Sequence, residues 1–199
     1  LHEPAIKGVM GAQVSGAKLV SFNCPAFISY GKDQSLNAPV GENTAFAYCN
    51  ALNYLLAHSQ YNMRIGDATV VFWADAPKET MDMTALLFGT IASSSPASPS
   101  MDTMTFEKVS LIMKQLRQGE LSQEILENAK VPFFILGLSP NASRLSLRFW
   151  YQSTFGELME NIQAHYRDIS LVRQWTEKNS KYPDPELPKP LDILKETVR

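Results

Sequence analysis

Two neighbouring apolar segments, residues 131–139 (VPFFILGLS) and 143–151 (SRLSLRFWY), constrain the fold more than any other feature of the sequence. Both have the length and the aromatic and branched content of strands. A turn at Pro140 and Asn141 separates them, which predicts an antiparallel pair. The first segment is apolar throughout, and this is typical of a central strand that is covered on both faces.

The second segment alternates in polarity, as a strand with one face in the core does. Its expected core positions are Leu145, Leu147, Phe149 and Tyr151, and its expected open positions are Arg144, Ser146, Arg148 and Trp150. The two arginines therefore lie on one open face, and they form the best candidate basic patch of the sequence. A solvated sheet face, or pairing of the arginines with acidic neighbours, explains them equally well.

The rest of the chain predicts both strands and helices. Residues 8–14 and 18–22 are expected to form a hairpin around Gly16, and residues 69–74 a strand after a turn at Gly66 and Asp67. Helical periodicity, caps and breakers predict helices over residues 43–57, 77–91, 105–118, 120–130 and 155–171. The fold class is therefore predicted to be α+β, with a mostly antiparallel sheet packed with helices.

The helix predicted over residues 43–57 is apolar nearly all round, so we expect it to be buried. It carries Asn50 and Asn53, and a buried amide costs about 1–3 kcal/mol unless it is hydrogen-bonded. The loop that precedes the helix is a candidate partner for both side chains.

That loop, residues 21–40, has neither a helical nor a strand period, yet it is too aromatic for a spare linker. We expect Phe22, Phe27 and Tyr30 to turn inward against the following helix, because large rings stabilise most when they are buried. Lys32 and Gln34 would then lie at an ordered tip, where they could meet a phosphate or a base edge. A purely structural loop is the alternative.

The domain organisation is predicted from composition. Residues 1–180 are expected to form one α+β domain, with a flexible Ser/Pro linker near residues 92–102. Residues 181–199 are expected to be a Pro-rich connector followed by the start of another helix. The ends of the sequence suggest a fragment of a larger protein.

The charge of the whole chain does not attract nucleic acid. Eighteen Lys and Arg residues stand against twenty Asp and Glu residues, which gives a formal net charge of -2. Contact with phosphates must therefore come from local patches. The candidate nucleic-acid-binding residues are Lys32, Gln34, Arg144 and Arg148.

No catalytic, cofactor-binding or metal-binding residue is predicted. Cys24 and Cys49 lack zinc-ligand spacing and are interpreted as reduced residues of a cytoplasmic protein, and no apolar run is long enough to span a bilayer. Two alternatives stay open. One is a nuclease or hydrolase fragment that uses His58 or His165 with carboxylates, and the other is a pure protein-interaction module.

Three blocks of the sequence together resemble a known family. They are VSFNCPAFISYGKDQSLNAPVGENTAFAYCNALNYLL, RIGDATVVFWAD and PFFILGLSPNASRLSLRFW, and they cover most of residues 20–150. In this order they closely resemble the large subunit of the subtype I-C CRISPR surveillance complex Cascade, a Csd-type CRISPR-associated protein. The chain would be an internal fragment of it.

The resemblance implies a non-catalytic subunit of an RNA-guided antiviral complex in a bacterial cytoplasm. Members of the family help to recognise the short motif beside the DNA target and to stabilise the opened duplex, and they present a platform to a helicase-nuclease. The implied partners are the other Cascade subunits, guide RNA, target double-stranded DNA and the helicase-nuclease. In such complexes guide pairing reads the target sequence, while protein reads the flanking duplex and the backbones.

Overall fold

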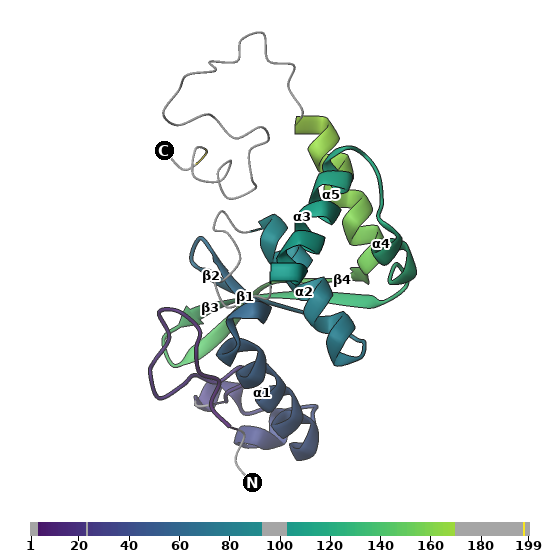
Figure 1. Cartoon of the computed structure of the whole chain (residues 1–199). Coiled ribbons are helices and arrows are strands. Elements are labelled where there is room, and N and C mark those ends of the chain that lie inside the picture. Colours follow the sequence, from purple (N-terminus) through teal and green to yellow (C-terminus); the bar gives the residue numbers. More distant parts are fainter. Residues whose placement is uncertain (1–3, 23, 93–102, 170–196, 198–199) are drawn as a thin grey trace. The chain divides into compact units, whose positions relative to one another are not determined.

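The computed structural model describes residues 4–22, 24–92, 103–169 and 197, with the elements that Figure 1 labels. The chain divides into two compact units. Unit 1 consists of Leu1–Trp73 and Phe134–Tyr151, and unit 2 consists of Ala74–Phe133 and Gln152–Arg199. The predicted Ser/Pro linker beyond residue 92, and the Pro-rich connector except for residue 197, lie outside the described residues.

The strands that the structure describes form a four-stranded sheet with the order β1-β2-β3-β4. Its strands are β1 (Asn62–Ile65), β2 (Ala68–Ala74), β3 (Pro132–Asn141) and β4 (Arg144–Thr154). The end of β2 meets the start of β3, where Asp75 N donates to Pro132 O at 2.9 Å, so these strands are antiparallel. The helices are described in the following paragraphs. Together with this sheet they confirm the predicted α+β class with its mostly antiparallel sheet.

The sequence did not predict β1, a short strand that pairs with β2 from Asn62↔Val71 to Ile65↔Ala68. The predicted turn at Gly66 and Asp67 joins the two strands, and Gly66 has a φ of +62°. Such a positive φ is typical of two-residue hairpin turns. The residues of β1 alternate between polar and apolar, but four residues are too few for this period to stand out in the sequence.

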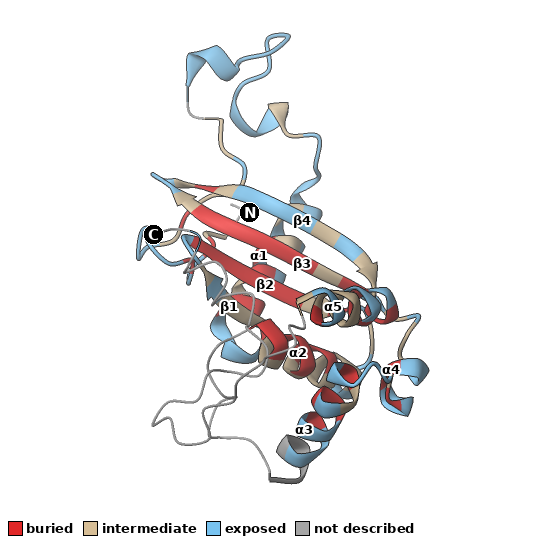
Figure 2. Cartoon of the chain, turned by 90° about the horizontal axis from the view of Figure 1, so that it is seen from above, coloured by how far each residue is buried: buried red, intermediate tan, exposed pale blue. Residues whose placement is uncertain are grey.

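The neighbours β3 and β4 differ in burial. Figure 2 shows β3 mostly buried and β4 mostly exposed. The prediction of a central β3 is therefore confirmed, whereas the prediction of a core face on β4 is wrong beyond Leu145. Leu147 is 58% exposed and Phe149 is 43% exposed. Because β4 is the last strand in the order of the sheet, its alternation lacks a full layer to pack against.

Within unit 1 the predicted helix of residues 43–57 is confirmed as α1 (Glu42–Ala57). It is not buried all round: Cys49, Leu52, Leu55 and Leu56 form its buried side, while Phe46 and Tyr54 are 44% and 45% exposed. The prediction that this helix is buried all round, which rested on its apolar composition, is therefore wrong.

Asn50 and Asn53 of α1 do not depend on the loop that precedes the helix. Asn53 accepts a hydrogen bond from Lys7 N at 2.8 Å and donates one to Ala5 O at 3.1 Å. Asn50 is exposed. The partner of Asn53 is therefore the N-terminal segment rather than residues 21–40.

The predicted hairpin of residues 8–14 and 18–22 is wrong. The segment forms only isolated bridges, Ile6↔Ala17 antiparallel and Lys18↔Arg144 parallel. Gly16 does take a positive φ of +99°, and a Cβ there would lie 2.6 Å from the Cβ of Ala5. Gly16 thus permits a tight turn of the chain. The segments on either side of the turn lack the alternation of apolar residues that would extend the pairing into strands.

Unit 2 holds the other helices: α2 (Lys78–Ala92), α3 (Thr103–Arg117), α4 (Gln123–Glu127) and α5 (Phe155–Ile169). Each agrees with a helix predicted from the sequence. The Ser122 side chain caps α4 by accepting from Ile125 N at 3.3 Å. The core of the unit includes Phe133, whose ring centroid lies 5.6 Å from that of Phe88 and 5.9 Å from that of Phe155.

Candidate nucleic-acid interface

The long loop of unit 1 is ordered by its own backbone and by one amide. Two short 3-10 helices, Pro25–Phe27 and Gln34–Asn37, occupy it. The Asn37 side chain donates to Lys32 O at 2.6 Å and to Gln34 O at 3.2 Å. These bonds order the loop from within and fix the backbone that carries the candidates Lys32 and Gln34.

A tight turn precedes Lys32. Lys32 N donates to Ser29 O at 2.9 Å, and the two central residues, Tyr30 and Gly31, have φ values of +51° and +72°. Two positive φ angles in succession define the turn type favoured in two-residue hairpins. Tyr30 is 99% exposed, so a large ring is held outward on a backbone that tyrosine rarely adopts.

The expectation that the aromatic residues of the loop turn inward is therefore wrong for two of them. Tyr30 points to solvent, and Phe27 is 40% exposed. Phe22 alone is half-buried, and it lines a pocket with residues of α1. The prediction assumed that buried rings are needed to order the loop. The Asn37 amide and the turn at Tyr30 and Gly31 order it instead.

Arg144 meets the loop through Phe27. Its guanidinium carbon lies 5.2 Å from the centroid of the Phe27 ring, a cation–π contact between the first residue of β4 and the first 3-10 helix. Lys18 pairs with the same residue along the backbone: Leu145 N donates to Lys18 O at 2.9 Å. The structure thus brings Lys18, Phe27 and Arg144 together from three separate segments.

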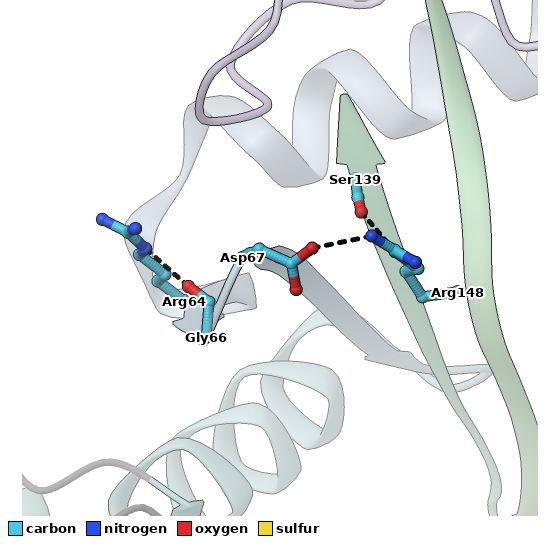
Figure 3. A network of polar contacts seen from close by, with 5 residues as sticks. All are labelled: Arg64, Gly66, Asp67, Ser139 and Arg148. Atoms are coloured by element: carbon cyan, nitrogen blue, oxygen red, sulfur yellow. Dashed lines mark hydrogen bonds and ion pairs between the residues drawn. The ribbon is translucent and has the colours of Figure 1, made fainter. Parts of the chain in front are cut away.

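Arg148 is held in a different network, which Figure 3 shows from close by. Its Nε donates to Ser139 Oγ at 2.6 Å, and one terminal nitrogen lies 2.7 Å from the Asp67 carboxylate. The Arg148 and Asp67 side chains are 53% and 75% exposed, so this ion pair is a surface one. Asp67 is thus an acidic neighbour of the kind that the alternative explanation of the two arginines requires. The ion pair also fixes the direction of the Arg148 guanidinium.

A pocket of about 650 Å³ opens between the loop and the first turns of α1. Gln34 lines it, together with Lys18, Phe22, Glu42 and Phe46. Its lining thus combines aromatic and apolar side chains with a few polar and charged ones, as ligand pockets commonly do.

The sequence did not point to Lys18 or Phe27 as site residues. Lys18 was placed only in the predicted hairpin of residues 8–14 and 18–22, and Phe27 was expected to turn inward against the following helix. The sequence contains no signal for the contacts of Lys18 and Phe27 with Arg144, because these segments are more than one hundred residues apart in the chain.

The histidines of the enzyme alternative belong to different units, His58 to unit 1 and His165 to unit 2. His58 follows α1 directly, and its Nδ1 lies 2.7 Å from Tyr54 O, with the two rings 4.3 Å apart. His165 lies in α5 and lines a small pocket of about 270 Å³ with Ile91 and Tyr166.

The two units differ in charge. Unit 1 contains six Lys and Arg residues and four Asp and Glu residues, whereas unit 2 contains twelve and sixteen. All four candidate residues, Lys32, Gln34, Arg144 and Arg148, belong to unit 1. The unit that carries the candidates therefore has a net charge of +2, which the total of -2 for the whole chain conceals.

Two searches complete the description of the site. Within the part of the chain that the structure describes, no group of three or more His, Cys, Asp or Glu residues is placed to hold a metal ion. Among the helices of the same residues, none combines the length and the apolar character that crossing a membrane requires.

The α+β fold, with a net positive unit that carries exposed aromatic and basic side chains, defines a candidate binding subunit. Comparison with protein families is more specific. Residues 1–199 match the model of the family described as CRISPR-associated protein (Cas_Csd1), so the chain belongs to this family of CRISPR-associated proteins. The resemblance found in the three sequence blocks is thereby confirmed. No curated protein matches the chain.

Proposed function

We propose that the chain is part of the non-catalytic large subunit of a type I-C CRISPR RNA-guided surveillance complex in the bacterial cytoplasm. In this role it helps to recognise the motif that flanks the DNA target, stabilises the opened target DNA and recruits the helicase-nuclease. Its partners are other Cascade subunits, guide RNA, target double-stranded DNA and the helicase-nuclease.

The distribution of charge supports this proposal most directly. Unit 1 has a net charge of +2 and unit 2 of -4, counted over the Lys, Arg, Asp and Glu residues of each. A protein that contacts phosphates needs local cations, because neutralising phosphates and releasing their counterions supplies most of the sequence-independent affinity. Unit 1 is then the surface that meets nucleic acid in the assembled complex.

Within unit 1 the candidate residues take different roles. Arg144 and Lys32 bind phosphate, and Gln34, on the fixed loop, meets a base edge or a sugar. Arg148 is positioned by Ser139 and Asp67, so that its remaining donors are presented in a defined direction.

The test is the salt dependence of DNA binding by the assembled complex. Replacing both arginines (Arg144→Ala with Arg148→Ala) should weaken binding of target DNA and reduce the slope of log K against log salt by up to about two phosphate contacts. The matched control is Lys114→Ala with Lys130→Ala, which removes two exposed lysines from unit 2. An unchanged slope in an intact complex that carries the arginine variants would contradict the proposal.

The loop is tested separately. Lys32→Ala with Gln34→Ala should leave folding intact, since both side chains are exposed, and should weaken binding of target DNA by the complex. Normal binding and normal interference with this variant would assign the loop to structure alone.

The enzyme alternative makes a distinct prediction. A nuclease or hydrolase that uses His58 or His165 would show metal-dependent cleavage that copurifies with the chain and disappears with His58→Ala or His165→Ala. The interaction-module alternative predicts that the arginine and loop variants change subunit assembly without changing DNA affinity.

A further inference from the structure

The pocket of about 650 Å³ beside α1 contains exposed apolar surface that the core of unit 1 does not use. Val20, Val40 and Phe46 line this pocket and are 39%, 42% and 44% exposed. Phe22 lines it from the loop and is half-buried. Exposed apolar side chains that gather around a concave site are typical of a ligand-binding pocket. All of these residues belong to unit 1, so the pocket is a feature of that unit alone.

The polar side chains of the same pocket match the hydrogen-bonding groups of a nucleobase. They comprise an amide, two hydroxyl groups, a carboxylate and a cation, which belong to Gln34, Ser21, Ser35, Glu42 and Lys18. The edge of a base carries both donors and acceptors, and proteins that hold a base outside a duplex combine polar contacts to this edge with aromatic or apolar walls. A purely apolar ligand would leave the polar groups of the pocket without partners, which is costly. The lining therefore favours a planar polar ligand over a lipid chain or an apolar side chain.

Gln34 has an unfavourable backbone conformation within this lining. Its φ is +45°, in the left-handed region that residues other than glycine rarely adopt. The Asn37 side chain holds this conformation by donating to Gln34 O at 3.2 Å and to Lys32 O at 2.6 Å. Glycine would adopt the same φ without strain, so the glutamine side chain carries a conformational cost that folding alone does not require. A contact between this exposed amide and a ligand explains the cost.

Two cationic side chains adjoin the pocket. Lys18 and Arg144 form a backbone bridge, in which Lys18 N donates to Ser143 O at 3.1 Å and Leu145 N donates to Lys18 O at 2.9 Å. Side chains of residues that pair in this way lie on the same face. Because Lys18 also lines the pocket, a ligand held there lies close to a cation, as the phosphate of a nucleotide requires.

We propose that the pocket beside α1 receives an unpaired nucleobase, with Phe22 and Phe46 as its stacking surface, Gln34 as the contact to its edge and Lys18 as the contact to its phosphate. The base belongs to a strand that the complex holds open, either of the target DNA or of the guide RNA. This inference rests on the proposed function and adds to it the place where a base is held.

The experiment uses the assembled complex and nucleic acids in which one unpaired nucleotide at a time is replaced by an abasic nucleotide. One series changes the opened target DNA and measures its binding, and a second series changes the guide RNA and measures its retention. The position whose base occupies the pocket should bind about 5- to 150-fold more weakly when it is abasic, the range expected for one stacked base. The series that contains this position identifies the strand.

Phe46→Leu tests the contact itself. In a complex that carries this variant, the abasic substitution at the sensitive position should cause little further loss, because the ring on which the base stacks is already absent. The matched control is Tyr54→Leu, since Tyr54 is on the same helix and is 45% exposed but does not line the pocket. This control should leave the full effect of the abasic position unchanged.

Gln34→Gly tests the amide without disturbing the loop. Glycine adopts the φ of +45° without strain, so the backbone should keep its conformation while the side chain is lost. The effect of the abasic position should then become smaller than in the unchanged complex. Any loss of coupling in this variant comes from the side chain, because the loop itself stays folded.

The outcomes separate this inference from the proposed function. Absence of a sensitive position, in a complex that binds target DNA normally, would overturn the inference and leave the proposed function standing. A sensitive position that keeps its full effect with Phe46→Leu and Gln34→Gly would place the base elsewhere and would overturn it too. Loss of subunit retention with both variants, without a change in the abasic effect, would assign the pocket to a protein partner instead. Target binding that does not depend on this subunit would overturn the proposed function itself.

Discussion

Units 1 and 2 both contain helices and strands of one sheet and both bury aromatic residues, Tyr61 and Phe72 in unit 1 among them, but unit 1 also has exposed rings. In unit 2 the rings of Phe88, Phe133 and Phe155 are buried against one another. In unit 1, rings that are far apart in the sequence stay exposed: Phe27 by 40%, Tyr30 by 99% and Trp150 by 52%. Exposed rings contribute little to folding, so their retention in unit 1 agrees with a binding surface.

The charge of the units follows the same division. The acidic unit 2, with twelve basic and sixteen acidic residues, buries Phe88, Phe133 and Phe155, whereas the basic unit 1, with six and four, exposes Phe27, Tyr30 and Trp150. Aromatic and basic side chains on one surface are the combination that single strands and backbones of nucleic acid require. The difference between the units teaches that the net charge of a whole chain can conceal opposite charges in its parts.

The largest effect is expected in the core of unit 2. Phe133→Ala removes a fully buried ring that contacts Phe88 and Phe155, so it should lower the free energy of unfolding by about 3–5 kcal/mol. Phe27→Ala, in unit 1, removes a cation–π contact at an exposed site and should cost about 1 kcal/mol or less. Denaturant unfolding of the two variants measures both values. Equal costs would remove the contrast between the units.

A smaller effect is expected where unit 1 depends on a polar contact. Asn53→Ala deletes the bonds to Lys7 N and Ala5 O and leaves these backbone groups without their side-chain partner, so it should cost about 1–3 kcal/mol. Asn50→Ala, at an exposed position of the same helix, should stay within about 0.5 kcal/mol. Denaturant unfolding compares the two. Similar costs would show that Asn53 does not hold the N-terminal segment.

The sequence predicted well the elements with strong local patterns. The helices α1, α2, α3 and α5 and the strand β3 have long periodic or continuous apolar runs, and each forms as expected. The hairpin of residues 8–14 and 18–22 failed because its glycines indicate a turn but carry no information on strand pairing. The alternation of β4 was correct as a strand signal, but a period of two cannot report whether a layer exists to cover it.

Prediction of the candidate nucleic-acid interface has the same limit: local contacts can be predicted from the sequence, and contacts between distant segments cannot. Lys32 and Gln34 were predicted on an ordered loop, and the loop is ordered by local bonds from Asn37 to Lys32 O and Gln34 O. The contact of Arg144 with Phe27, the contact of Arg148 with Asp67 and the contact between the rings of Trp73 and Trp150 all join distant segments. A single sequence carries no signal for such pairs.

A pH-dependent effect is expected in unit 2 from Tyr166. Burial raises the pKa of this phenol above its usual 10.0, while the neighbouring Arg117, by its charge and a hydrogen bond, lowers it by less. The unfolded chain therefore loses the proton first as pH rises, and the stability contributed by the neutral buried phenol is present below pH 10.0 and lost above it. The free energy of unfolding should fall by at most about 1.4 kcal/mol per pH unit there.

Tyr166→Phe is the control for this effect, since it keeps the ring in α5 and removes the ionisable group. Its stability should show a shallower decline above the same pH than that of the unchanged chain. Parallel curves for the two proteins would mean that Tyr166 titrates alike in the folded and unfolded states.

The smallest effect on stability, and the one that bears most on unit 1 as a binding surface, is expected from Asp67. Its ion pair with Arg148 joins side chains that are 75% and 53% exposed, and such surface pairs contribute about 0–1 kcal/mol. Asp67→Asn should therefore change the free energy of unfolding by less than about 1 kcal/mol. It should also release Arg148 from a competing carboxylate, so that the complex binds DNA more tightly and the slope of log K against log salt grows by up to about one phosphate contact. Asp33→Asn, an exposed acidic residue of the same unit, is the matched control for the change in net charge alone. Tighter binding with Asp67→Asn but not with Asp33→Asn would show that Arg148 faces the nucleic acid, whereas equal gains would reduce the contribution of unit 1 to its overall charge.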